Sequence, residues 1–165
     1  MSSSDSAIKQ LVQQLAEKLL SRKLIISTAE SCTGGWIAQS LTDLAGSSAW
    51  FDTGFVTYSN AAKQRLLEVP EAYFQPDGPG AVSEETVRAM TRGAIDNSRA
   101  NVAVAVSGIA GPDGGSTEKP VGTVWIAWQW EDMSNAQSFL FSGDRRAVRV
   151  ATVEAALGGL LILLS

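Results

Sequence analysis

The stretch ANVAVAVSG, residues 100–108, constrains the fold more than any other part of this sequence. Its valines favour an extended strand, and small or apolar residues occupy both of its alternating faces. A strand that is apolar on both faces lies in the middle of a sheet that is covered on both sides. The chain is therefore expected to place helices above and below a central sheet.

The remaining elements fit this expectation. Apolar residues at helical spacing predict an amphipathic helix over residues 5–22, and Ser83 and Asp144 are suitable N-caps for later helices. Further helices are expected from Trp36 to near Gly46 and after Ser59 or Asn60, with strands over 23–28, 50–59, 100–108, 121–130 and 136–143. We predict one domain spanning residues 1–165, a three-layer α/β/α sandwich with a mixed, mostly parallel sheet.

Composition excludes several classes of function. The chain has no histidine and one cysteine, so the usual zinc sites and every Ser-His-Asp or Cys-His arrangement are unavailable within it. A hydrolase built on this sequence needs another base, and no metal or cofactor is expected. The net charge of −4 argues against nucleic acid and anionic membranes as partners.

The two ends of the chain carry no sign of a membrane or export signal. The start, MSSSDSAIKQ, is polar and unlike a signal peptide. The apolar tail from Ala151 to Leu164 contains Glu154 and is shorter than a membrane span. A lone cysteine fits a reducing compartment, and we expect a cytoplasmic protein.

The motif TAESCTGG, residues 28–35, follows the first predicted strand and opens a helix. Such a turn leaves backbone N–H groups of Thr33, Gly34 and Gly35 available for an anion or a developing oxyanion. An ordinary helix cap formed by Ser31 or Thr33 explains the motif equally well. Cys32 is a possible nucleophile, but a lone cysteine without histidine is more typical of packing.

Lys63 and Tyr58 are the next candidates. Lys63 falls in the first turn of a predicted helix, where the helix dipole disfavours a cation. In a dry pocket this position lowers the pKa of the amine and makes it a base, whereas in solvent it is an ordinary surface lysine. Tyr58 ends the preceding strand, so it either reaches the same cleft or packs at the sheet edge.

A long glycine-rich loop spans Ser107 to Thr123 and is a candidate for ligand binding. Ser107, Gly108 and Gly111 allow backbone to approach a ligand, and Lys119 offers charge for a phosphate; a plain connection between strands is the alternative. After the loop, Arg145 or Arg146 near a helix start suits a phosphate or carboxylate, although salt bridges within the protein serve equally.

Several long motifs in the same order resemble the CinA C-terminal domain family, also called the nicotinamide mononucleotide amidase family. They are TAESCTGGW, GSSAWFDTGFVTYSNAAK, GAVSEE, SGIAGPDGGSTEKPVGTVW and GDR, which together cover essentially the whole chain. The resemblance implies hydrolysis of the carboxamide of nicotinamide mononucleotide to nicotinic acid mononucleotide and ammonia, in NAD recycling. Family members often have a histidine before GAVS, where this chain reads PDGPGAVS, which places substrate preference in question.

Carried over to matching positions, the resemblance implies Ser31 as nucleophile, Lys63 as its base and Tyr58 in an orienting or proton-relay role. It also implies that the glycine loop and Arg145 hold the ribose phosphate. Two other functions remain open: a nucleotide-binding module that has lost catalysis, and an amidase for another small amide. Exposed tryptophans and the apolar final helix predict a homodimer or higher homo-oligomer.

Overall fold

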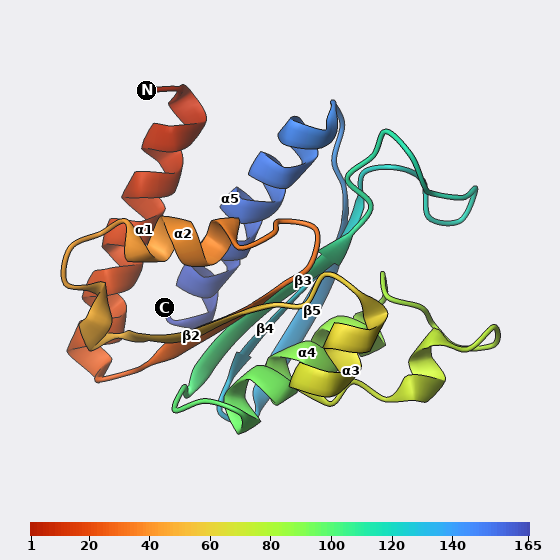
Figure 1. Cartoon of the computed structure of the whole chain (residues 1–165). Helices are drawn as coiled ribbons and strands as arrows, with labels where there is room; N and C mark the ends of the chain where they lie inside the picture. Colours follow the sequence, from red (N-terminus) through yellow and green to blue (C-terminus); the bar gives the residue numbers. More distant parts are fainter.

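The computed structural model describes residues 1–165 as one five-stranded sheet with helices on both faces (Figure 1). The helices are α1 (Ser3–Arg22), α2 (Trp36–Thr42), α3 (Asn60–Leu67), α4 (Glu84–Asp96) and α5 (Arg145–Leu163). The strands are β1 (Ile26–Glu30), β2 (Phe51–Val56), β3 (Val102–Gly108), β4 (Thr123–Trp130) and β5 (Met133–Leu140). Two short 3-10 helices, η1 (Ser47–Ala49) and η2 (Glu71–Phe74), lie in the connections.

The order of strands in the sheet is β2-β1-β3-β4-β5. β1 pairs in parallel with β2 and β3, whereas β4 pairs antiparallel with both β3 and β5. β4 is therefore the single strand that runs against the other four, which confirms a mixed, mostly parallel sheet. The carboxyl ends of β1, β2, β3 and β5 meet at one edge, where open α/β sheets commonly bind ligands.

Alternation along β3 divides the interior into two cores. Val102, Val104 and Val106 face the larger core beneath α1, α2 and α5, while Ala103 and Ala105 face the smaller core beneath α3 and α4. Figure 1 shows the two helical layers on opposite sides of the sheet. The predicted central strand and three-layer sandwich are thus confirmed.

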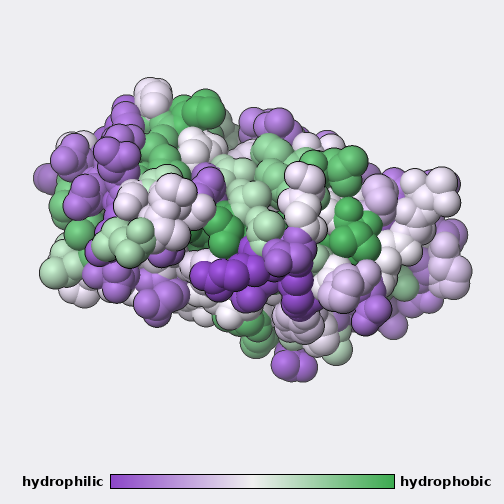
Figure 2. Space-filling model, turned by 90° about the horizontal axis from the view of Figure 1, so that it is seen from above, coloured by the Kyte–Doolittle hydropathy of each residue, from purple (hydrophilic) through white to green (hydrophobic).

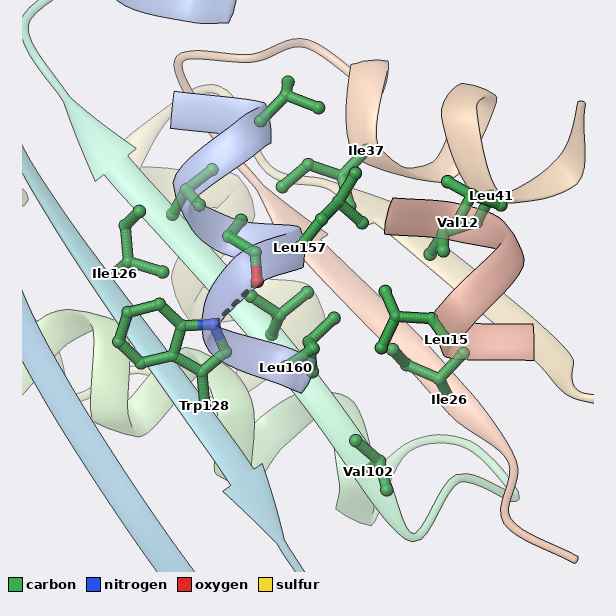
Figure 3. Packing of buried hydrophobic residues seen from close by; sticks show 14 of the residues in the cluster. Val12, Leu15, Ile26, Ile37, Leu41, Val102, Ile126, Trp128, Leu157 and Leu160 are labelled. Atoms are coloured by element: carbon green, nitrogen blue, oxygen red, sulfur yellow. Dashed lines mark hydrogen bonds between the residues drawn. The ribbon is translucent and has the colours of Figure 1, made fainter. Parts of the chain in front are cut away.

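The larger core packs strand residues against α1 and α5 (Figure 3). Ile26 of β1 lies among Leu15 and Leu160, all of them fully buried. The ring of Trp128 is anchored because its indole Nε1 donates a 2.8 Å hydrogen bond to the carbonyl oxygen of Ala156 in α5. This packing holds α5 on the sheet, and the N-cap Asp144 sets where the helix begins.

Several element boundaries differ from the sequence prediction. Lys23 ends α1 in the left-handed conformation (φ 56°), so β1 starts only at Ile26 and continues to Glu30. The first residues of TAESCTGG are therefore part of the sheet. The N-cap of α3 is Ser59, whose side chain accepts a hydrogen bond from the backbone N–H of Ala62; this places Lys63 one position deeper in the helix than an Asn60 cap would.

Two predictions, on the exposure of the tryptophans and on the apolar tail, can be compared with the structure. The predicted exposed tryptophans are wrong: Trp50 and Trp128 are buried, and the other three are half-buried. Their rings pack on the core or beneath arginine side chains. The guanidinium of Arg22, for example, lies over the ring of Trp130. The apolar tail forms the second half of α5, and no helix combines the length and apolar character that a membrane span requires.

Candidate active site

A pocket of about 250 Å³ lies at the edge of the sheet where the strands end. Residues that follow β1, β2 and β3 reach it, together with the start of α5. Its lining consists of Ser31, Cys32, Tyr58, Asn60, Lys63, Ala81, Val82, Ser107, Gly108, Ala110, Gly111, Asp113 and Arg145. A larger pocket of about 610 Å³ between α1 and α2 holds none of the predicted site residues, so the smaller one is the candidate site.

Ser31 and Lys63 meet in this pocket. Ser31 is the first residue after β1, and Lys63 projects from the first turns of α3, which follows β2. Because β1 and β2 are parallel neighbours, their carboxyl ends bring these two elements together. The Nζ of Lys63 lies 2.9 Å from the Oγ of Ser31, a distance at which a proton passes between nucleophile and base.

Two backbone carbonyl groups aim the Lys63 amine. Its Nζ lies 2.9 Å from the carbonyl oxygen of Thr57 and 3.4 Å from that of Tyr58. A neutral amine has two N–H donors and one lone pair, so donation to both carbonyls leaves the lone pair for the hydroxyl proton of Ser31. The protonated amine can donate to all three oxygens, so the geometry accommodates both protonation states, of which only the neutral form can act as the base.

Burial of Lys63 favours that same form. Its side chain is 1% exposed, and no carboxylate forms a salt bridge with it. Desolvation lowers the pKa of Lys63 from 10.5 to about 8, against a weaker opposing influence of the Cys32 thiol. An appreciable fraction of the amine is consequently neutral near physiological pH.

The Cys32 thiol belongs to the larger core, where it packs with apolar residues. Burial raises its pKa to about 12, so the reactive thiolate is absent at neutral pH. This environment supports the packing interpretation of Cys32 over a nucleophilic one.

Glu30 occupies the opposite face of β1 from Ser31 because adjacent strand residues alternate. It is fully buried, and its carboxylate accepts hydrogen bonds from the Thr33 hydroxyl and from the backbone N–H groups of Ile37 and Ala38, at 2.8 and 3.0 Å. Desolvation raises the pKa of Glu30, while these hydrogen bonds oppose the rise. The N-terminus of α2 is therefore satisfied by the protein's own carboxylate.

This arrangement changes the expectation for the glycine turn. The N–H of Gly34 donates to the carbonyl oxygen of Ser31 at 3.1 Å, and Gly35 is the N-cap of α2 with a left-handed φ of 103°. Thr33, Gly34 and Gly35 do not line the pocket. The N–H groups of Cys32 and Thr33 have no acceptor in another residue, and of these two residues only Cys32 lines the pocket, beside Ser31.

Tyr58 and Arg145 form the mouth of the pocket. The guanidinium of Arg145 donates to the Tyr58 hydroxyl at 3.0 Å and to the carbonyl oxygen of Gly111 at 2.7 Å. Tyr58 is 61% exposed, and its hydroxyl contacts Arg145 rather than Ser31 or Lys63. The tyrosine therefore approaches the dyad through its backbone carbonyl, while its ring and hydroxyl border the entrance.

Only part of the glycine-rich loop lines the pocket. Ser107, Gly108 and Gly111, which were predicted to bind a ligand, line the pocket. Lys119 does not: its Nζ donates to the carbonyl oxygen of Pro79 at 2.7 Å, which ties the glycine-rich loop to the loop after η2. Arg146 also lies outside the pocket, stacked 5.0 Å from the ring of Trp36. The start of α5 lies on the face drawn in Figure 2, where strongly hydrophilic residues gather near the middle.

Sequence reasoning missed three groups. Asn60 and Asp113 line the pocket, and Glu30 supports the turn that carries Ser31. Asp113 belongs to the glycine loop already suspected, so its polar side chain was an available signal. The role of Glu30 could have been inferred only with β1 extended to that residue, since alternation then places Glu30 and Ser31 on opposite faces.

Comparisons with known proteins identify the family of this chain. The family model described as the CinA C-terminal domain matches residues 8–164. The chain is 56% identical to "Nicotinamide-nucleotide amidohydrolase PncC" of Pseudomonas putida over 94% of this chain and 96% of that protein, and 53% identical to the protein of the same name from Escherichia coli strain K12 over 88% and 87%. A crystal structure of a competence/damage inducible protein from Agrobacterium tumefaciens superposes with a TM-score of 0.92 at 45% identity, covering 96% of both chains.

Proposed function

This chain belongs to the CinA C-terminal domain family, and on that premise we propose that it hydrolyses the carboxamide of nicotinamide mononucleotide. The products are nicotinic acid mononucleotide and ammonia. The names of the relatives from Pseudomonas putida and Escherichia coli support an amidohydrolase of nicotinamide nucleotides. The observation that carries the proposal is the 2.9 Å contact between Ser31 and a buried lysine in a pocket at the carboxyl edge of the sheet.

In the first half of the proposed reaction, neutral Lys63 takes the hydroxyl proton of Ser31, and the Ser31 oxygen attacks the carboxamide carbon. The carbonyl oxygen of the substrate becomes an oxyanion, which the N–H of Cys32 can stabilise because no other residue accepts from it. The tetrahedral intermediate then collapses and breaks the carbon–nitrogen bond. Protonated Lys63 gives its proton to the departing nitrogen, which leaves as ammonia.

The second half removes the acyl group. Lys63, neutral again, takes a proton from water, and the resulting hydroxide attacks the acyl carbon. The ester bond to Ser31 breaks, and the lysine returns its proton to the Ser31 oxygen. The product of these steps is a carboxylic acid, which ionises to the carboxylate by releasing its proton to solvent, so one water is consumed and atoms and charge balance.

Substrate recognition follows from the charge at the pocket mouth. The guanidinium of Arg145 is held by Tyr58 and Gly111 and forms no salt bridge with a carboxylate. It suits the phosphate of a mononucleotide. Ser107 and Gly108, at the end of β3, form the wall nearest the dyad on the neighbouring strand.

The assay is direct. Purified protein is mixed with nicotinamide mononucleotide, and ammonia and nicotinic acid mononucleotide are quantified, while calorimetry measures nucleotide binding separately. Equal amounts of both products support the proposal. Binding without turnover would instead support a nucleotide-binding module, and turnover of other small amides in preference to this nucleotide would support a different amidase.

We further propose that the protein acts in the cytoplasm as a homo-oligomer. The proposed nucleotide substrate and the single, unpaired cysteine favour the cytoplasm. Exposed apolar side chains, including Leu140 of β5 and Ile162 of α5, favour self-association, and analytical ultracentrifugation distinguishes a monomer from a dimer.

A further inference from the structure

Arg149 has no role in the mechanism above, yet it touches the turn that carries the nucleophile. It lies in the second turn of α5, on the side of the sheet opposite Lys63. Its Nε donates to the carbonyl oxygen of Cys32 at 3.1 Å, and its Nη2 donates to that of Thr33 at 3.0 Å. One guanidinium therefore holds two consecutive carbonyl groups directly behind Ser31.

The contact with the Thr33 carbonyl continues as a chain of hydrogen bonds toward the pocket, whereas the contact with the Cys32 carbonyl fixes the adjoining peptide of the turn. The peptide whose carbonyl belongs to Thr33 carries the N–H of Gly34, which donates to the carbonyl oxygen of Ser31 at 3.1 Å. The peptide whose carbonyl belongs to Ser31 carries the N–H of Cys32. That N–H faces the thiol of its own residue and has no acceptor in another residue, so the chain ends next to the nucleophile on a donor that no other residue uses.

The direction of this last donor is fixed by covalent geometry. In a planar trans peptide the C=O and the following N–H point in opposite directions. Orienting the Thr33 carbonyl orients the Gly34 N–H, and this in turn orients the Ser31 carbonyl and the Cys32 N–H. Gly34 accommodates the arrangement with a left-handed φ of 62°, and a Cβ there would lie 3.4 Å from the Nη2 of Arg149.

The chain also transmits charge. Hydrogen bonds in series polarise one another, and the first donor here is a guanidinium that is always protonated. The N–H of the residue after a nucleophilic serine is a frequent oxyanion donor in hydrolases with a strand–turn–helix nucleophile. We propose that Arg149 is a positioning residue that orients and strengthens the Cys32 N–H as an oxyanion donor.

The surroundings of Arg149 suit this role. No carboxylate pairs with it, so its charge is not neutralised by a salt bridge. Its guanidinium stacks 5.3 Å from the ring of Trp36, which restricts its movement. Arg149 does not line the pocket, and it therefore acts on the substrate through the turn. This inference rests on the proposed amidase function.

The test compares Arg149→Met and Arg149→Lys with Arg146→Met as the matched control. Arg146 stacks on the same Trp36 ring at 5.0 Å but donates to no carbonyl of the turn. With nicotinamide mononucleotide, Arg149→Met is expected to lower kcat by about 10- to 100-fold, somewhat less than removal of an oxyanion donor, with KM changed by less than about threefold. Arg149→Lys, which keeps the charge but not the paired donors, is expected to recover part of the loss, and Arg146→Met to stay within about twofold of wild type.

A second substrate separates this inference from the proposed function. Acylation of Ser31 by p-nitrophenyl acetate, followed as the burst of p-nitrophenolate, needs the oxyanion donor but no nucleotide. If wild type is acylated but does not hydrolyse the nucleotide, the proposed function fails, and a slower burst in Arg149→Met alone still supports the role of Arg149. Equal bursts in Arg149→Met and Arg146→Met, a raised KM at unchanged kcat, or no burst in wild type would overturn it.

Discussion

The Nζ of Lys63 lies 2.9 Å from the Oγ of Ser31, although the two residues are 32 positions apart and belong to different elements. The contact depends on the parallel pairing of β1 with β2, which carries both chain segments to the same edge of the sheet. The carbonyl oxygens of Thr57 and Tyr58 occupy the two donors of a neutral Lys63 amine. The predictions below follow from this geometry.

The rate of amide hydrolysis should depend on pH through Lys63. Its pKa is lowered to about 8 by burial, and only the neutral amine accepts the Ser31 proton. We expect kcat/KM to rise as pH increases and to level off above an apparent pKa near 8. Cys32→Ala should keep the same ascending limb, because the thiol pKa is about 12. A limb that disappears in Cys32→Ala would contradict the assignment.

Lys63 should also lower the free energy of unfolding, by an amount that depends on pH. Since the folded-state pKa is below the unfolded value of 10.5, the unfolded chain binds more protons between pH 8 and 10.5. The destabilisation is therefore complete below about pH 8 and is lost as the pH rises to 10.5. Urea unfolding should show Lys63→Met to be more stable than wild type by up to about 3 kcal/mol at pH 7.

The control for this prediction is Lys9→Met at an exposed position of α1. It should change the free energy of unfolding by less than about 0.5 kcal/mol at either pH. If the Lys63→Met difference were absent at pH 7, or equally large at pH 10.5, the amine would not carry the unfavourable buried charge inferred here.

Removal of the Glu30 carboxylate should destabilise the fold. Glu30→Ala leaves the buried N–H groups of Ile37 and Ala38 without an acceptor, and we expect a loss of at least about 2 kcal/mol in the free energy of unfolding. Glu84→Ala, which removes an exposed partner of Arg88, should cost less than about 1 kcal/mol. Similar losses in the two variants would show that the carboxylate is not supporting α2.

Steady-state kinetics should distinguish Arg145 from Lys119, the two cations predicted to hold the phosphate. Arg145 borders the pocket, whereas Lys119 is bound to the carbonyl of Pro79 outside it. Arg145→Met should raise KM for the nucleotide about tenfold or more with kcat within about threefold, because binding energy is lost equally from ground and transition states. Lys119→Met should raise KM much less, and a reversed order in steady-state kinetics would assign the phosphate to Lys119.

Much of the fold could be predicted from local sequence because its signals are local. Alternating valine and alanine in residues 100–108 indicated a strand buried on both faces, and Ser83 and Asp144 cap the helices expected of them. Boundaries were harder: nothing in the sequence around Lys23 signals its left-handed backbone, which delays β1 and carries Glu30 into the sheet.

The candidate site was less accessible to sequence reasoning because it depends on contacts between distant segments. The side chain of Lys119 is directed by the carbonyl of Pro79, which lies 40 positions away. The hydrogen bonds from the N-terminus of α2 to Glu30 likewise form only because the Glu30 side chain projects from the face of β1 that α2 covers. By contrast, the absence of histidine indicated that a hydrolase would need another base, and the resemblance to the CinA C-terminal domain family implied that this base is Lys63.

The central claim is that Ser31 attacks and Lys63 removes its proton. It is tested most directly by measuring ammonia release from nicotinamide mononucleotide with Ser31→Ala, Lys63→Ala and Cys32→Ala, each confirmed as folded by circular dichroism. We predict a loss of about 1,000-fold or more in kcat for the first two variants. Cys32→Ala, which keeps its backbone N–H, should retain at least about a third of wild-type activity. Full activity in Ser31→Ala, or its abolition in folded Cys32→Ala, would contradict the account.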